Sequence, residues 1–184
     1  MKNIIIAIFA LFLVAGCSMF NKESEQSKFT IGSPINDINS TNMQIKVLPF
    51  TSLYPARTEM MFCNGENSFV YDNTNTWLNT PQTMVTEYFE LYFNNPLKKS
   101  SKNFEYKLGI KGRIITFACN LLNKEVTLTL LINIYNTNDD TLVYSTIYTS
   151  KVTISNLSAS EYSIAISKAI NAIAFSLQQK LLTL

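Results

Sequence analysis

The chain has 184 residues, a formal net charge of +2 and no histidine. This length suits one domain with a single hydrophobic core. The absence of histidine excludes Ser-His-Asp, Cys-His and histidine-based zinc sites. The 15 basic residues form no block that could neutralise many phosphates, so the sequence does not indicate nucleic-acid binding.

A targeting segment is expected over residues 1–16. Lys2 supplies one positive charge, and residues 4–15 form an apolar run of 12 residues, short of the roughly 20 that a spanning helix needs. The run ends in LVAGC at residues 13–17, which resembles the bacterial lipobox. We therefore expect cleavage before Cys17 and covalent attachment of diacylglycerol to its sulfur. An ordinary signal peptide with an incidental cysteine is the alternative.

The segment 17–40 is predicted to be the acylated cysteine followed by a flexible tether, because its polar stretch 21–28 has no apolar periodicity. The folded domain is then expected over 41–184. Ser18, rather than aspartate, follows the cysteine, and by resemblance to enterobacterial sorting this favours the outer membrane. The domain would face the periplasm.

The first half of the domain combines strands with one helix. QIKVLPF at residues 44–50 predicts a strand, and 51–57 a loop. Asn64-Gly65 between two apolar stretches predicts a β-hairpin over 59–72. Apolar residues recur at helical spacing after Thr80-Pro81, an N-cap and a first-turn proline, until Asn94.

Three long strands and a second helix follow. Alternating apolar residues predict strands near 106–114, 126–134 and 142–154, paired as an antiparallel meander. Ser158 and Glu161 have the spacing of a capping box. The helix that they begin carries one apolar stripe, made of Tyr162, Ile166, Ala169, Ile170, Ile173, Leu177 and Leu181.

These elements predict a single-domain α/β fold: a mixed sheet of about six strands, largely an antiparallel meander in its second half, with two main helices packed on it. Cys63 and Cys119 lie in apolar strands without a CxxC pair. They favour buried free thiols, with one disulfide as the alternative.

The block from Val47 to Phe89 resembles the ABC-type transport auxiliary lipoprotein family, the group that includes PqiC. The resemblance is carried by VLPF at 47–50, LYPAR at 53–57 leading into EMMF at 59–62, SFVY at 68–71, and Trp77 followed by Thr80-Pro81. The second half fits less strongly, with YKL at 106–108 opening a strand, an antiparallel pair and a C-terminal amphipathic helix.

The resemblance implies a non-catalytic accessory lipoprotein without a cofactor beyond its covalent lipid. Such proteins work with an ABC permease and ATPase and with an MCE-domain (mammalian cell entry) protein. Together they move phospholipids or other hydrophobic molecules across the bacterial envelope. Assembly as a homo-oligomeric ring against the MCE partner is a further expectation from the family.

Candidate partner contacts are large or charged side chains in or beside the predicted loop: Leu53, Tyr54, Arg57, Tyr71 and Trp77. Arginine and aromatic residues supply much of the energy of protein interfaces, and loops on rigid scaffolds carry function. Trp77 is more simply explained as a core residue. Arg57 could instead form an ion pair with Glu59 or Asp72.

Other functions remain open at this point. Asp72 with Glu87, or Asp139 with Asp140, could be read as catalytic carboxylates, but without histidine we expect no enzyme, and Asp-Asp is typical of a turn. Another envelope-assembly or secretion lipoprotein could share the anchor and the small domain. In a third class, the domain itself would hold an acyl chain between sheet and helices.

Overall fold

The computed structural model describes residues 26–34, 45–65, 68–94 and 106–184. The predicted signal peptide over 1–16, the predicted lipidation site Cys17 and part of the predicted tether lie outside these residues. No helix within the described ranges is both long and apolar enough to cross a bilayer.

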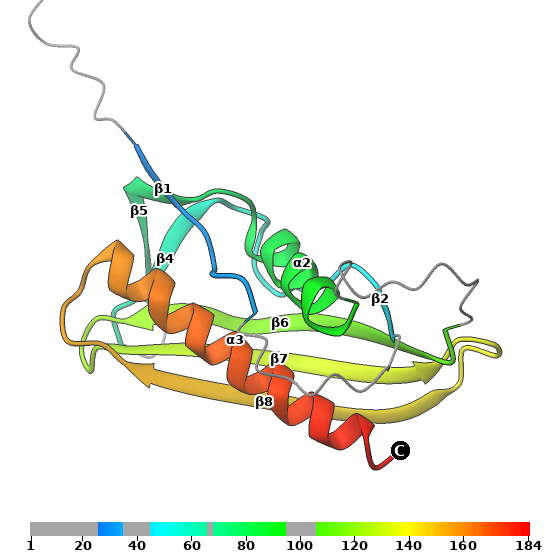
Figure 1. The fold of residues 1–184 in the computed structure, drawn as a ribbon. Helices are drawn as coiled ribbons and strands as arrows, with labels where there is room; N and C mark the ends of the chain where they lie inside the picture. The colour runs from blue at the N-terminus through cyan, green and yellow to red at the C-terminus, as the bar shows by residue number, and fades with distance from the viewer. Residues whose placement is uncertain (1–25, 35–44, 66–67, 95–105) are drawn as a thin grey trace, which may run out of the picture.

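One mixed sheet carries two helices that contact each other (Figure 1). In chain order the elements are β1 (Ser27–Phe29), β2 (Ile45–Val47), β3 (Thr51–Ser52), β4 (Glu59–Cys63), β5 (Phe69–Trp77), α2 (Pro81–Phe93), β6 (Leu108–Asn120), β7 (Glu125–Asn136), β8 (Leu142–Thr153) and α3 (Ala159–Leu181). The strand order is β1-β5-β4-β6-β7-β8, with β2 and β3 also pairing with β6. The predicted α/β fold is confirmed, with eight strands among the described residues instead of about six.

β6 is the strand on which the sheet is built. Along one edge it pairs antiparallel with β7, from Leu108 opposite Asn136 to Asn120 opposite Glu125, and β8 completes the predicted meander. Along its other edge β2, β3 and β4 pair in parallel, one after another. Alternate residues of β7 are buried, so the apolar face of the meander is covered by the helices.

The strand predicted over 44–50 is interrupted, and pairing resumes at Thr51 inside the predicted loop. Pro49 has no N–H to donate, and the Phe50 N–H donates to the Thr86 hydroxyl of α2 at 2.9 Å instead of to the sheet. The Phe50 ring fills the space over Gly112, where a Cβ would collide with it. The break therefore places an aromatic side chain between sheet and helix.

The predicted hairpin is confirmed by β4 and β5. Cys63 lies opposite Phe69, and Gly65 has a φ of +91°, the backbone conformation for which glycine is suited. Glu59 pairs with Thr76 but Met60 with Asp72, so residues 73–75 bulge out. This bulge lets β5 continue to Trp77, beyond the expected end at residue 72.

Both helices begin where the sequence predicts. The Thr80 hydroxyl accepts from the Thr83 N–H, with Pro81 in the first turn, and the Ser158 hydroxyl accepts from the Glu161 N–H. The second half of the predicted capping box differs. The Glu161 carboxylate accepts from Ser155 N and Asn156 N, at 2.8 and 3.0 Å, so it fastens the preceding loop. All residues of the predicted apolar stripe are buried.

Residues 26–34, expected in the tether, are part of the fold. β1 pairs in parallel with β5, and Ile31 joins the core at 9% exposure. Three further hydrogen bonds hold the segment: Leu78 N to Phe29 O at 2.6 Å, Ser163 Oγ to Thr30 O at 2.7 Å and Gly32 N to Ser167 Oγ at 2.8 Å. The folded part of the chain thus begins before residue 41.

The core is organised around Tyr162 of α3. Its side chain is fully buried, and its hydroxyl lies 3.2 Å from Met61 O and 3.1 Å from Phe117 O. These carbonyls lie just before the short β4–β6 ladder, which begins at Phe62 and Cys119. Burial raises the pKa of Tyr162, which keeps the hydroxyl protonated as the donor. One side chain therefore links α3 to both strands.

Replacing Tyr162 with phenylalanine should lower the free energy of unfolding by about 1–3 kcal/mol, because two buried carbonyls lose their donor while the ring packing is kept. Urea unfolding followed by circular dichroism measures the change. Tyr71→Phe, at a half-buried position outside the core, is the control. Equal midpoints for wild type and Tyr162→Phe would show that the hydroxyl does not contribute.

Cys63 and Cys119 are both free thiols, as favoured from the sequence. Cys119 pairs with Phe62 across β4 and β6, and paired residues share one face of the sheet. Cys63 follows Phe62 in the chain, so its side chain points to the opposite face. A disulfide between them cannot form in this register. Cys119 is buried in the core, whereas Cys63 is half-buried and its Sγ lies 2.8 Å from Gly65 O.

The two thiols should react at different rates. Burial raises the pKa of the Cys119 thiol to about 11, so we expect Cys63 to react with a thiol reagent in the native protein and Cys119 to react only after denaturation. Mass spectrometry after alkylation, with and without urea, counts the modified sites. Two rapidly modified thiols in the native protein would contradict this assignment.

Candidate functional site

The predicted loop lies against the outer face of the hairpin, the face away from the helices. Phe62 of β4 points inward, with its ring 5.4 Å from that of Tyr162, so its neighbours Met61 and Cys63, with their partners Tyr71 and Phe69, point outward. The loop covers these side chains. We call the group formed by Leu53, Tyr54, Pro55, Arg57, Phe69 and Tyr71 the loop surface.

Two aromatic contacts hold the loop surface together. The Tyr54 ring centroid is 5.5 Å from that of Phe69, and Arg57 Cζ lies 5.0 Å above the Tyr71 ring. The Tyr54 N–H also donates to the Ser52 hydroxyl at 3.1 Å. Leu53 remains 51% exposed. The loop surface therefore contains four of the five predicted contact residues. Tyr54, Arg57 and Tyr71 take part in the aromatic contacts, and Leu53 precedes Tyr54 in the chain.

Phe69 was missed by the sequence analysis. It is 39% exposed, and its ring packs against the ring of Tyr54. Its position could have been found from the strand period, because it lies two residues before Tyr71 in the predicted hairpin and must share its face.

Arg57 does not form the ion pair that was its alternative role. Among the described residues, neither Glu59 nor Asp72 forms a salt bridge with it. Its guanidinium is exposed and stacks on Tyr71, an arrangement that fixes its direction while leaving its N–H donors accessible. Such a side chain can bind a carboxylate of a partner.

Trp77 lies in the core, as its simpler explanation requires. It is 1% exposed, and its ring meets Phe117 and Tyr162 edge to face at 5.3 and 5.2 Å. It also lines the inner wall of a small pocket beneath the loop surface, with a volume of about 30 Å³. Small-molecule sites usually have about 300–1,000 Å³, so this pocket suits one or two waters or the tip of one side chain.

Two polar atoms of this pocket's lining residues are buried without a hydrogen-bond partner among the described residues, namely Trp77 Nε1 and Gln82 Oε1. One is a donor and the other an acceptor. Buried polar groups are normally paired, so these two atoms are exceptions within the described residues.

The carboxylates considered for catalysis are used in local structure. Asp72 accepts from Thr74 N, Thr74 Oγ1, Asn75 N and Asn75 Nδ2 at 2.7–3.1 Å, which holds the bulge of β5. Burial opposes ionisation, but these hydrogen bonds prevail and lower the pKa of Asp72 to about 2. Glu87 is on the exposed side of α2.

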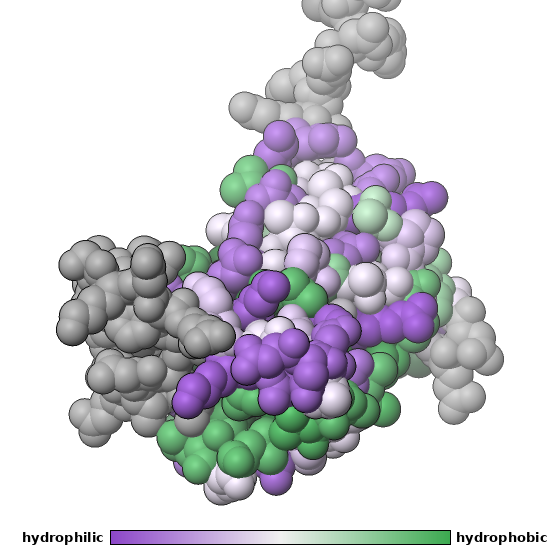
Figure 2. Space-filling view, turned by 90° about the vertical axis from the view of Figure 1, so that its right-hand side faces the viewer, coloured by the Kyte–Doolittle hydropathy of each residue, from purple (hydrophilic) through white to green (hydrophobic). Residues whose placement is uncertain are grey.

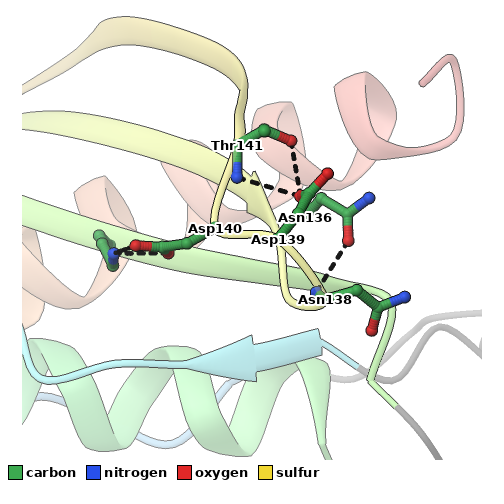
Figure 3. Close-up of polar contacts among 6 residues, drawn as sticks. Asn136, Asn138, Asp139, Asp140 and Thr141 are labelled. Carbon is green, nitrogen blue, oxygen red and sulfur yellow. Dashed lines mark hydrogen bonds and ion pairs between the residues drawn. The ribbon is translucent and has the colours of Figure 1, made fainter.

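Asp139 and Asp140 form the β7–β8 turn (Figure 3). Asp139 Oδ1 accepts from the Thr141 hydroxyl and N–H at 2.8 and 3.1 Å, and these bonds lower the pKa of Asp139. Asp140 adopts φ +54° and pairs with Lys111 at 2.9 Å. The two carboxylates therefore serve separate partners, as expected for turn chemistry.

A second exposed apolar region lies far from the loop surface. Figure 2 shows the end of the molecule that is on the right in Figure 1, with apolar side chains in a band along its lower part, where β8 and the end of α3 lie. Exposed members on β8 are Leu142 at 64%, Val143 at 44% and Ile147 at 58%.

Comparison with known proteins identifies the fold. No family model matches the chain, and no curated protein matches it significantly. A crystal structure described as an uncharacterized protein aligns with a TM-score of 0.69 at 9% identity, covering 85% of this chain and 98% of that one. A protein from Xanthomonas campestris assigned to the family model DUF330 aligns with a TM-score of 0.66 at 12% identity, covering 82% and 90%. At these identities the likeness concerns the fold alone.

The hydrogen bonds of Asp72 should make stability depend on pH. The pKa of Asp72 in the fold is about 2, below the ordinary value of 3.8. The ionised carboxylate therefore contributes fully to the free energy of unfolding above about pH 5, and this contribution is lost as pH falls from about 4 to 2. Asp72→Asn should flatten this part of the curve of urea midpoint against pH, whereas Glu87→Gln should not. Parallel curves for wild type and Asp72→Asn would contradict the assignment.

Proposed function

We propose that the protein is a non-catalytic, membrane-anchored lipoprotein that serves as an accessory component of an MCE-type ABC transport system. The system would move phospholipid or other hydrophobic molecules across the bacterial envelope. The observation that carries the proposal is the agreement of two independent features. The motifs in 47–89 resemble the PqiC-like family, and the whole fold aligns with a structure assigned to DUF330, the domain family of PqiC-like proteins.

The membrane attachment in this proposal depends on the lipobox. Cys17 would carry the lipid and the domain would face the periplasm, with the outer membrane favoured by Ser18. The partners would be the MCE-domain protein and its permease and ATPase, with a ring of copies as a further form of assembly. No nucleic acid is involved in this role.

The loop surface is the proposed contact with the MCE partner. It offers the exposed ring of Phe69, the half-buried rings of Tyr54 and Tyr71, an oriented arginine and a small pocket. Aromatic and arginine anchors beside a small pocket are typical of interface hot spots. Trp77 would act from beneath as the pocket wall.

Two other functions lead to different expectations. Another envelope-assembly or secretion lipoprotein would share the anchor and fold but have other partners. A carrier that holds an acyl chain itself needs far more than the 30 Å³ of the pocket beneath the loop surface. Native mass spectrometry of protein purified without added lipid tests the carrier function, since a carrier should retain a lipid mass.

The proposal is tested by crosslinking in intact cells, affinity capture of the tagged protein in mild detergent, and mass spectrometry of the captured proteins. Recovery of an MCE-domain protein with its permease and ATPase is the expected result. Recovery of secretion or outer-membrane assembly components instead would reject the transport role and leave only a lipoprotein of another system.

Arg57→Ala should weaken capture of the MCE partner by about ten-fold or more, the usual effect of removing an interface arginine, while the melting temperature stays unchanged because the side chain is exposed. Arg113→Ala, at an exposed position of β6 outside the loop surface, is the matched control. A large fall in melting temperature for Arg57→Ala, or equal capture by both variants, would contradict the contact role.

A further inference from the structure

Three connections meet at one end of the sheet. They are the β4–β5 turn, the β6–β7 turn and the segment between β8 and α3. Leu121 N donates to Cys63 O at 2.9 Å, and Ile154 N donates to Lys124 O at 2.9 Å, so the second connection is bonded to both of the others. We call this the turn end of the sheet.

Two of the connections at the turn end each expose a leucine, and β5 exposes Val70, its second residue, near the same end. Leu122 is 72% exposed, Leu157 45% and Val70 49%. Single exposed leucines are common, but here two come from neighbouring connections at one end of the sheet. Lys124 lies in the same turn as Leu122, and its Nζ donates to Ser155 O at 3.2 Å, near the Glu161 carboxylate.

Local hydrogen bonds hold the turns that carry Leu122 and Leu157. Asn120 Oδ1 accepts from Leu122 N and Asn123 N at 2.9 and 3.3 Å, and Lys124 closes the turn with φ +52°. Next to Leu157, the Glu161 carboxylate binds the N–H groups of Ser155 and Asn156. The exposure is therefore built into rigid turns.

The position of β1 sets how far the domain can stand from an anchor at Cys17. A tether over the whole of 17–40 could place the domain about 80 Å from Cys17. Because residues 26–34 are part of the fold, only nine residue-to-residue links separate Cys17 from Gln26, and these span at most about 30 Å. Gln26 Nε2 bonds to Asn73 O at 3.2 Å. Asn73 lies about four residues, or about 13 Å, from the turn end.

The opposite end of the molecule is the competing surface. It includes Leu142, at the start of β8, which is 64% exposed. β8 is at the far edge of the sheet from β1. Counting residues along strands and spacings between them places Leu142 about 33 Å from Gln26 and Leu122 about 20 Å. A tether that spans at most about 30 Å reaches Leu122 with slack and falls short of Leu142.

We propose that the turn end, through Leu122 and Leu157, is the surface with which this domain rests on the lipid membrane that holds its anchor. The inference rests on the lipidation of Cys17 in the proposed function. Leucine side chains on rigid turns would enter the boundary between headgroups and acyl chains. The contact orients the domain, while the covalent lipid supplies the attachment.

The test uses the lipidated full-length protein in vesicles of phosphatidylethanolamine and phosphatidylglycerol that contain a nitroxide-labelled lipid. An environment-sensitive fluorophore is attached to Leu122→Cys or to the matched control Leu142→Cys, both in a Cys63→Ser background. Cys119 stays unlabelled because it is buried. Leu157→Cys provides a second position at the turn end, should Leu122→Cys not fold.

Quenching of the fluorophore by the nitroxide-labelled lipid should be about two-fold or more stronger at position 122 or 157 than at position 142. The reason is that a turn in contact with the membrane lies within the headgroup boundary. Equal quenching, or stronger quenching at 142, in protein that floats with the vesicles would overturn the orientation while leaving the anchor intact. Protein that neither floats nor carries a lipid mass on Cys17 would overturn both.

Discussion

The hydroxyl of Tyr162 satisfies a constraint that comes from the way β4 meets β6. The two strands share only a short parallel ladder, Phe62 with Cys119 and Cys63 with Asn120, and before it they diverge. Divergence inside a core would leave the carbonyls of Met61 and Phe117 without donors, which is costly. α3 can cover this position because Tyr162 supplies both the ring that fills the space and the hydroxyl that bonds the two carbonyls.

The same divergence creates the candidate site. Between β3 and β4 the chain leaves the edge of β6, and the loop that results folds over the outer face of the hairpin instead of continuing the ladder. The pocket beneath it is lined by residues from both sides of this gap, Met61, Trp77 and Phe117 among them. Core packing at Tyr162 and the shape of the loop surface are therefore linked through Trp77, which contacts Tyr162 and lines the pocket beneath the loop surface.

Sequence patterns predicted the elements whose signals are local. The Asn64-Gly65 hairpin, the capped helices and the meander each depend on residues close in the chain. β1 was not predicted because three residues carry no periodic signal, and its pairing depends on β5, which lies far along the chain. The predicted role of Glu161 in the capping box was wrong for a similar reason, since its carboxylate accepts hydrogen bonds from N–H groups of the preceding loop. The loop surface could be predicted as a cluster of neighbours in sequence, but the stacking of Arg57 on Tyr71 depends on how the loop folds back.

The loop surface combines exposure with order, and this bears on how it could work in a binding protein. A loop that becomes ordered only on binding must lose side-chain and backbone freedom at that moment, which lowers affinity. Here Tyr54 rests on Phe69 and Arg57 on Tyr71 before any partner arrives. These contacts are supported by a two-stranded hairpin whose inner face is fixed through Phe62 to Tyr162. The arrangement therefore reduces the entropy lost on contact, which favours a loop that recognises a partner over one that merely connects two strands.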